Sequence, residues 1–433
     1  MTSTALLTDH YELTMLQAAL RSGAAERRCV FEVFARRLPE GRRYGVVAGT
    51  GRLLEAIRDF RFGEAELASL REAHVVDEQT LDFLAGYRFT GDIAGYPEGE
   101  CFFPGSPLMV VEACFAEGVL LETLILSVLN HDAAVAAAAS RMICAAGSRP
   151  CLEMGSRRTH EQAAVAAARA AYVAGFAATS NLEAGRTYGV PTAGTSAHAF
   201  TLLHDDERTA FEAQVASLGK ETTLLVDTYD VTAAVQTAVE VAGPELGAVR
   251  LDSGDLLTQA AEVRAQLDAL GARDTRIVVT SDLDEYAIAA LAAAPVDSYG
   301  VGTSLVTGSG APTAGLVYKL VSRADAGGTL VDVAKKSKDK ASVGGRKWAL
   351  RRLGADGVAE AEVIGVGARP VDDGDDRPLL VELMRDGEVV ATDLDLASAR
   401  RRHERSRAEL PPRAHQLSRG EPAIPTVYET GRP

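Results

Sequence analysis

One histidine stands in surroundings that could make it reactive. The stretch PTAGTSAHAF, residues 191–200, places His198 among small or apolar residues, directly after a tight turn at Gly194, Thr195 and Ser196. Imidazole changes its charge near neutral pH, which sets histidine apart as a functional side chain. A structural histidine in a packed loop would explain the same residue, so the rest of the chain has to decide between the two interpretations.

A pair of aspartates could bind a sugar or a metal ion. In RLDSGDLL, residues 250–257, Asp252 and Asp255 flank Ser-Gly where a predicted strand passes into a predicted helix. Asp and Ser at such a junction can simply cap the helix by accepting hydrogen bonds from its first amides. Alternatively, one carboxylate faces a pocket and binds ribose hydroxyls or hydrated Mg²⁺, which prefers one or two carboxylates plus ligand phosphates.

A glycine-containing loop further on could bind a phosphate. In YGVGTSLVTG, residues 299–308, glycines precede Thr303 and leave room for backbone amides to approach an anion, although a plain tight turn could have the same sequence. The segment TSDLDE, residues 280–285, contains Asp282 and would lie beside this loop in the fold expected below. Together the two segments could form a phosphate cup.

Two arginines could hold a carboxylate. EMGSRRTHE, residues 153–161, places Arg157 and Arg158 after a short apolar run. They could be exposed residues at the start of a solvated helix. A guanidinium that faces a pocket would instead bind a carboxylate through two parallel hydrogen bonds.

These residues follow a repeated pattern that predicts how they are positioned. From about residue 150, a short apolar run, a polar cluster and a helical stretch recur seven times, as in successive β-α units. The runs end at CLEMGSRR, FAATSN, VPTAGTSAH, TLLVDTYD, GAVRLDSGD, RIVVTSDLD and DSYGVGTS. In a β/α barrel the carboxyl ends of the strands converge on one face, whereas an open doubly wound sheet gathers ligands at one switch point. We therefore predict an α/β protein built on an irregular β/α barrel.

The barrel is expected to be one of three segments. We predict an N-terminal α/β domain over 1–147, the barrel over 148–319, and a sheet segment over 320–433 that packs with the N-terminal domain as one discontinuous domain. The last segment has strand-like pieces such as GLVYKLV and KWALRRL, followed by the helical LASARRRHERSRAEL.

The amino-acid composition restricts the kinds of binding partner and the cellular compartment that we expect for this protein. The 433 residues include 45 Lys and Arg against 60 Asp and Glu, a net charge of −15, which opposes nonspecific binding to nucleic acid or anionic membranes. Five cysteines without C-x-x-C spacing favour free thiols in a reducing compartment. No signal peptide is expected, and charged residues interrupt the most apolar stretch, 118–140, which predicts a buried helix. We expect a cytoplasmic protein.

Taken together, the motifs resemble those of nicotinate phosphoribosyltransferases. The resemblance rests on LLTDHYELTM, on residues 153–198, on VRLDSGDLL and on YGVGTSLVT, in matching order over most of residues 6–320. KKSKDKASVGGRK, residues 335–347, resembles the family's C-terminal marker. The resemblance implies a fold of the type II phosphoribosyltransferase kind. It also implies a reaction of nicotinate with phosphoribosyl pyrophosphate that gives nicotinate mononucleotide and pyrophosphate, in NAD biosynthesis, with Mg²⁺ and coupled to ATP hydrolysis.

The resemblance also implies roles for individual residues. His198 matches the histidine that ATP phosphorylates, and its small neighbours would leave room for the phosphoryl group. Tyr11 matches a tyrosine that packs on the pyridine ring in a neighbouring subunit's pocket, which implies a homodimer with shared sites. The remaining matches are Arg157 and Arg250 at the nicotinate carboxylate, Thr195 beside the ring, Asp252 near the ribose and Mg²⁺, and Gly302 with Thr303 at the 5′-phosphate.

The sequence departs from the family pattern at two places, and two alternative functions stay open. Met154 stands where the family commonly has an aromatic residue, which weakens two-sided stacking on the ring, and Gly344-Gly345 replaces the usual Pro-Gly. The rival functions are a phosphoribosyltransferase for nicotinamide or quinolinate and a noncatalytic nucleotide-binding regulator. The Gly-Thr-x-Ala-His motif with the paired arginines favours nicotinate, and the intact His198, Arg250 and Asp252 favour an enzyme.

Overall fold

The computed structural model describes residues 4–335 and 342–430, so residues 336–341 of the C-terminal marker lie outside the described residues. The chain divides into two compact units. A terminal unit comprises residues 1–137 and 311–433, and a central unit comprises residues 138–310. Our predicted boundaries, 147/148 and 319/320, lie near this division, which cuts the long helix α6 (Glu122–Ala146) between residues 137 and 138.

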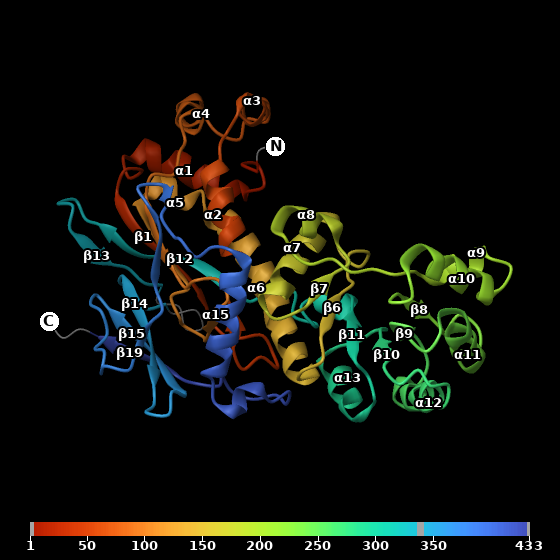
Figure 1. Cartoon of the computed structure of the whole chain (residues 1–433). Helices are drawn as coiled ribbons and strands as arrows, with labels where there is room; N and C mark the ends of the chain where they lie inside the picture. The colour runs from red at the N-terminus through yellow and green to blue at the C-terminus, as the bar shows by residue number, and fades with distance from the viewer. Residues whose placement is uncertain (1–3, 336–341, 431–433) are drawn as a thin grey trace. The chain divides into compact units, whose positions relative to one another are not determined.

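The central unit is built on one parallel sheet. Its strand order is β7-β6-β11-β10-β9-β8, and every adjacent pair is parallel. Figure 1 shows helices α10 to α13 beside the strands that they connect. After α6 the elements are β6 (Cys151–Glu153), α7 (Glu161–Val173), β7 (Ala178–Thr179), α8 (Leu182–Tyr188), α9 (His198–Leu203), α10 (Glu207–Leu218), β8 (Thr223–Leu225), α11 (Val231–Ala242), β9 (Ala248–Leu251), α12 (Leu256–Ala269), β10 (Arg276–Val279), α13 (Glu285–Ala290), β11 (Ser298–Val301) and α14 (Thr303–Val306).

The predicted β/α architecture is confirmed, with one exception. Six of the seven apolar runs form strands, but the third, around residues 190–193, makes only an isolated parallel bridge between Thr192 and Thr179. The prediction of a seventh strand is therefore wrong. Pro191 lacks the backbone N–H that a strand needs for its ladder, and the Gly194 that follows disfavours regular extension. In the described residues the sheet thus stays open between β8 and this segment.

The terminal unit joins the two ends of the chain in one sheet. Its order is β13-β12-β1-β5-β3-β17-β18, and the interior strand β1 (Arg28–Ala35) pairs antiparallel with both β12 (Leu316–Ala324) and β5 (Met109–Cys114). Residues from both ends share one core, which includes Leu13, Phe31 and Leu383. The expectation of a discontinuous α/β domain is confirmed.

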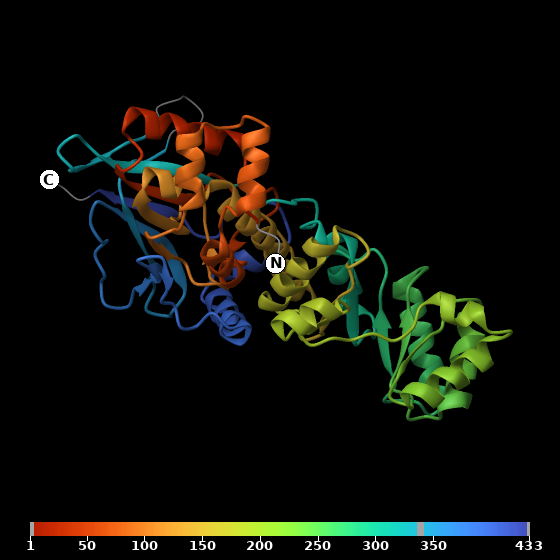
Figure 2. The ribbon, with the colours of Figure 1, turned by 90° about the horizontal axis from the view of Figure 1, so that it is seen from above.

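Helices and a smaller sheet complete the terminal unit. In both views helices α1 to α4 gather on one side of the large sheet, and β14, β15 and β19 form a second sheet on another side (Figure 1 and Figure 2). The remaining elements are α1 (His10–Ser22), β2 (Gly45–Val46), α2 (Thr50–Asp59), α3 (Glu64–Glu72), α4 (Glu78–Ala85), β3 (Asp92–Gly95), β4 (Cys101–Phe102), α5 (Phe115–Val119), β13 (Leu330–Asp332), β14 (Lys347–Leu353), β15 (Ala359–Val366), β16 (Arg377–Pro378), β17 (Val381–Arg385), β18 (Glu388–Val389), α15 (Leu396–Ala408) and β19 (Thr426–Thr430).

Helix α6 contains most of the apolar stretch that predicts a buried helix. By length and composition alone it could cross a membrane, but 72% of its most apolar window is buried inside the fold. Core helices of globular proteins share this composition, so the observed burial agrees with the prediction.

Candidate active site

Two neighbouring cavities lie at the carboxyl ends of the strands in the central unit. The first, the His198 cavity, has a volume of about 470 Å³ and is lined by residues 193–198 together with Arg250. The second, the Gly302 cavity, has a volume of about 210 Å³ and is lined by Arg158, Asp282, Gly302 and Thr303 among others. Both cavities are lined by Met154, Arg157, Asp252 and Thr280, which therefore form a shared wall.

His198 begins helix α9 and is held by a carboxylate. Its side chain is 38% exposed, and its Nε2 lies 3.2 Å from Oδ1 of Asp227, whose side chain is only 2% exposed. A ring nitrogen that donates to a carboxylate fixes the tautomer, so the other nitrogen keeps its lone pair. The contact with Asp227 thus orients the His198 ring and leaves its other nitrogen available as a nucleophile.

Asp227 also connects the histidine to the Asp252 loop. Its Oδ2 accepts hydrogen bonds from the backbone N–H of Asp252 at 2.9 Å and from the hydroxyl of Ser253 at 2.7 Å. Our sequence prediction missed Asp227. The available signal was its place directly after an apolar run, the same position that Asp252 occupies after its run.

Asp252 lies on the shared wall and accepts a hydrogen bond from Thr280. The Thr280 hydroxyl donates to Oδ1 of Asp252, and the Thr280 amide donates to the Leu251 carbonyl at 2.8 Å. Among the described residues no hydrogen-bond donor contacts Oδ2. The geometry fits the prediction that this oxygen faces a sugar or a metal ion.

Arg250 presents a positive charge in a confined place. Burial lowers its pKa, and the positive charge of Arg157 adds to the lowering, while the carboxylates of Asp252 and Asp227 oppose it. The buried Nε of Arg250 has no hydrogen-bond partner among the described residues. Two guanidinium groups that influence each other in this way would both be stabilised by an anion bound between them.

The Gly302 cavity depends on close backbone packing. A Cβ on Gly300 would lie 2.5 Å from Thr280 Cγ2 and 2.7 Å from Met154 Sδ, so glycine is needed there. Ser281 adopts a φ of 129°, a strained value for a residue with a side chain, and strain of this kind clusters at functional sites. Met154, whose amide donates to the Val301 carbonyl at 2.8 Å, places its side chain against Gly300 on the shared wall.

The structure brings eight of the nine predicted site residues to these two cavities. They are Arg157, Thr195, His198, Arg250, Asp252, Asp282, Gly302 and Thr303. The ninth, Tyr11, lies in the terminal unit on α1, where it is 44% exposed. The cavities are thus assembled as expected, and the role of each residue stays a prediction.

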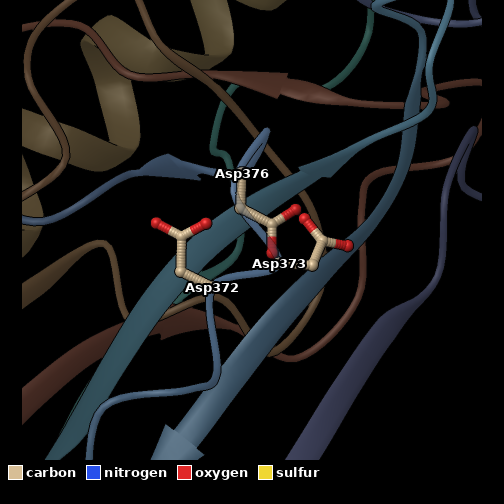
Figure 3. Close-up of side chains that lie close together, drawn as sticks. All are labelled: Asp372, Asp373 and Asp376. Atoms are coloured by element: carbon tan, nitrogen blue, oxygen red, sulfur yellow. The ribbon is translucent and has the colours of Figure 1, made fainter.

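Metal ligation can be judged from the acidic side chains. In the described ranges, the group of acidic side chains with mutually close ligand atoms is Asp372, Asp373 and Asp376, in the terminal unit (Figure 3). Arg352 lies 3.2 Å from Asp376 and 3.6 Å from Asp373, so a guanidinium already pairs with two members of this cluster. In the central unit Asp252 and Asp282 line the Gly302 cavity, and one or two carboxylates suit Mg²⁺ where substrate phosphates supply further ligands.

Comparison with known proteins identifies the family. Residues 6–130 match the model of the nicotinate phosphoribosyltransferase N-terminal domain. The nicotinate phosphoribosyltransferase pncB1 of Mycobacterium tuberculosis is 60% identical over 430 residues, which cover 97% of this chain and 94% of that protein. The chain belongs to the nicotinate phosphoribosyltransferase family. The family resemblance noted in the sequence is thereby confirmed.

More distant members share both sequence and fold with this nicotinate phosphoribosyltransferase. The human nicotinate phosphoribosyltransferase is 32% identical over 435 residues, which cover 84% of this chain and 80% of that protein. The crystal structure of the human enzyme superposes with a TM-score of 0.83 at 27% identity and covers 97% of both chains. A nicotinate-nucleotide pyrophosphorylase of Pyrococcus furiosus has the same fold, with a TM-score of 0.78 at 23% identity and coverage of 94% and 95%.

Proposed function

We propose that this nicotinate phosphoribosyltransferase joins nicotinate to phosphoribosyl pyrophosphate for NAD biosynthesis. The bond from the ribose C1′ to the pyrophosphate oxygen breaks, and a bond from C1′ to the pyridine nitrogen forms. The observation that carries the proposal is the shared wall, where Arg157 and Asp252 line both cavities. A substrate with a carboxylate and one with a ribose phosphate could be held there side by side.

Each part of the substrates has a chemically suitable partner. Arg157 and Arg250 bind the nicotinate carboxylate, and Thr195 lies beside the ring. Asp252, oriented by Thr280, accepts hydrogen bonds from the ribose hydroxyls, while Gly302 and Thr303 hold the 5′-phosphate. Because the departing pyrophosphate leaves positive charge on the ribose, positioning and electrostatic stabilisation supply most of the acceleration. Mg²⁺, held by Asp252 and the phosphates, would neutralise charge on the leaving group.

ATP acts through His198 in this proposal. The free ring nitrogen attacks the γ-phosphorus of ATP, the bond to the β-phosphate oxygen breaks, and ADP leaves. Asp227 supports the step because its carboxylate stabilises positive charge that develops on the imidazole. Water later cleaves the phosphoryl group from nitrogen and releases phosphate, so the phosphohistidine changes substrate affinity without attacking the sugar.

Exposed apolar residues support a homodimer. Leu6 and Leu7, just before α1, are 40% and 74% exposed, and Tyr11 and Met15 on α1 are 44% and 36% exposed. Contiguous exposed apolar residues mark interaction surfaces. Burial and the nearby Glu122, Glu12 and Asp9 raise the pKa of Tyr11 to about 12, so its phenol stays neutral and can pack on an aromatic ring. Tyr11 is therefore proposed to complete the pocket of the partner subunit.

The five cysteines support the proposed compartment. All five are free thiols, and burial raises the pKa of Cys101 and Cys151 to about 12. Such thiols are unreactive and suit a reducing environment. We place the enzyme in the cytoplasm.

Parallel turnover assays test the function. Purified protein with phosphoribosyl pyrophosphate and Mg²⁺ should convert nicotinate, but only poorly nicotinamide or quinolinate, and ATP should increase the rate. Faster turnover of either other substrate would reassign the enzyme, and absence of pyrophosphate release with all three would indicate a regulator.

With γ-labelled ATP, an acid-labile and base-stable label should form on His198. His198→Ala should lose ATP hydrolysis and keep slow transfer, whereas a stable phosphoserine would contradict the ATP step.

A further inference from the structure

Glu153, the last residue of β6, is a buried carboxylate that the proposed mechanism does not use. Its exposed fraction is 0%, and no cationic side chain of the described residues pairs with it. Burial raises its pKa, while hydrogen bonds from Thr179 and Gly155 oppose that rise. A buried carboxylate without a cation destabilises a fold. We therefore expect Glu153 to have a role that a hydrophobic side chain could not perform.

The two oxygens of this carboxylate hold two different segments. Oε1 accepts a hydrogen bond from the Gly155 amide, and Oε2 accepts one from the Thr179 hydroxyl. An ionised carboxylate can only accept hydrogen bonds, so the Gly155 amide and the Thr179 hydroxyl must both donate to Glu153. Such charge-assisted hydrogen bonds are about twice as strong as neutral ones. The side chain of Glu153 thus adds to the parallel pairing of β6 with β7, in which the Ser180 amide donates to the Glu153 carbonyl at 2.8 Å.

The Gly155 contact fixes the turn that carries the arginines. The Arg158 amide donates to the Gly155 carbonyl at 2.8 Å, which closes the turn around Arg157. A Cβ on Gly155 would lie 2.3 Å from Val306 and 3.1 Å from the Gly302 carbonyl oxygen, so this turn packs directly on the Gly302 loop. Movement of Glu153 would therefore shift the guanidinium groups on the shared wall.

The Thr179 contact fixes the segment that leads to His198. Thr179 is 1% exposed, its amide donates to the Pro191 carbonyl at 2.9 Å, and its carbonyl accepts from the Ala193 amide at 2.9 Å. These two bonds form the isolated bridge that stands where a seventh strand was expected. Since no strand ladder secures residues 190–197, their register depends on Thr179.

We propose that Glu153 is a positioning residue that couples the arginine turn to the His198 segment. Through Gly155 it sets where nicotinate is held, and through Thr179 it sets where the phosphoryl group is received. The inference rests on the proposed function, because these two events belong to that reaction. It predicts that loss of the Thr179 contact affects phosphorylation of His198, whereas loss of the Gly155 contact affects binding of nicotinate.

Four variants separate the contacts. Thr179→Val keeps the shape and removes the hydroxyl, which donates to Glu153 and also accepts from the Asn181 amide at 2.9 Å. Glu153→Ala removes both contacts of the carboxylate. Glu153→Gln can restore both, because its oxygen accepts from Gly155 while its amide donates to the Thr179 hydroxyl. Thr187→Val is the control, since it removes a Thr–Glu hydrogen bond of 2.9 Å on the exposed helix α8.

Thr179→Val should slow labelling of His198 by ATP about 10-fold or more, because that is the usual effect of losing a hydrogen bond to a charged group. The KM of this variant for nicotinate should stay within about twofold of the wild-type value. Glu153→Ala should impair both, whereas Glu153→Gln and Thr187→Val should stay within about threefold of wild type. Unchanged labelling in Thr179→Val, or a parallel loss of labelling and nicotinate binding, would overturn the proposal.

Hydrogen–deuterium exchange gives a readout that does not depend on activity. Residues 190–198 should exchange faster in Thr179→Val, while residues 154–158 should exchange as in wild type. Equal exchange in both proteins would also overturn the coupling, even if Glu153→Ala fails to fold. Wild-type protein that turns over no nicotinate would instead refute the proposed function, so the two failures are distinguishable.

Discussion

Asp227 is the residue that most changes how the active site is understood. With one oxygen it holds His198, and with the other it holds the backbone of Asp252, so the proposed ATP step and the proposed ribose site share one carboxylate. Residue type alone could not single it out, because only its place directly after an apolar run distinguishes it from Asp230. In TLLVDTYD, Asp227 and Asp230 stand in equivalent polar surroundings, yet Asp230 caps α11 by accepting from the Ala233 amide at 2.8 Å.

Asp227→Asn should separate these roles. The amide keeps the size of the side chain but loses the charge that stabilises the imidazolium, so labelling of His198 by ATP should fall at least 10-fold. Transfer without ATP should fall less, because Asn can still accept from the Asp252 amide. Asp268→Asn, an exposed substitution on α12, is the control. Labelling at the wild-type rate in Asp227→Asn would rule out this role.

Arg157 tests how the enzyme distinguishes nicotinate from nicotinamide. Its guanidinium influences Arg250 and lines both cavities, so it can reach a carboxylate between them. Arg157→Ala should lower kcat/KM for nicotinate by about 10- to 150-fold, which corresponds to roughly 1.5–3 kcal/mol, and leave the poor use of nicotinamide nearly unchanged. If both values of kcat/KM fall in parallel, Arg157 positions the site generally and does not bind the carboxylate.

Strands and loops of the central unit show what the sequence pattern predicts well. Six runs form the expected strands because each is short, apolar and followed by a helix, and parallel strands bring their polar carboxyl ends together. The same rule drew attention to the segments of Arg157, His198, Asp252, Asp282 and Gly302, whereas Thr195 and Arg250 were assigned through the family resemblance. The rule failed around residue 191 because the pattern weighs hydrophobicity, whereas Pro191 removes a backbone donor. The hydroxyl of Thr179 and the carboxylate of Glu153 had no signal in the pattern.

Gly300→Ala tests the packing of β10 against β11. The new methyl group would lie 2.5 Å from Thr280 Cγ2, so Thr280 must move, and Asp252 would lose its orienting hydroxyl. Overpacking of this kind costs about 1–3 kcal/mol of stability, and a misplaced site can lose about 100-fold in rate. We expect kcat/KM to fall at least 10-fold and Tm to fall. Gly86→Ala, with 3.7 Å to the nearest atom, should change neither quantity.

Helix α15 should make the terminal unit sensitive to acid. His403 is 2% exposed, its Nδ1 lies 3.2 Å from the Gly99 carbonyl oxygen, and burial lowers its pKa from 6.5 to about 4. Because the folded pKa lies below the unfolded one, this stability is fully present above pH 6.5 and is lost as pH falls toward 4. The loss should amount to about 3 kcal/mol.

Denaturant unfolding of wild type and His403→Gln at several pH values checks this expectation. The variant can still donate to Gly99 but does not titrate, so its free energy of unfolding should fall less between pH 6.5 and 4. An identical pH dependence in both proteins would show that other groups control the acid transition.

At the scale of the whole molecule, the proposed dimer, in which Tyr11 of one subunit completes the pocket of the other, can be tested with two variants. Tyr11→Ala and Asp252→Ala proteins should each be inactive. When they are refolded together, a mixed dimer would contain one pocket without either substitution and should recover part of the activity. Mixed dimers that form, as shown by mass, but stay inactive would exclude a shared site.

The two-part division of the chain has a consequence for biosynthesis. β1 ends at residue 35 and its partner β12 begins at residue 316, so the ribosome must add the whole central unit before the large sheet of the terminal unit can close. At about 5–20 residues per second, that interval lasts roughly 15–60 s. During this time an edge of β1, with its apolar face, has no native partner, whereas residues 138–310 are contiguous and include no later segment of the chain. Nascent chains of this enzyme should therefore depend on chaperones early in translation, and stop depending on them once residues beyond 324 have left the ribosome.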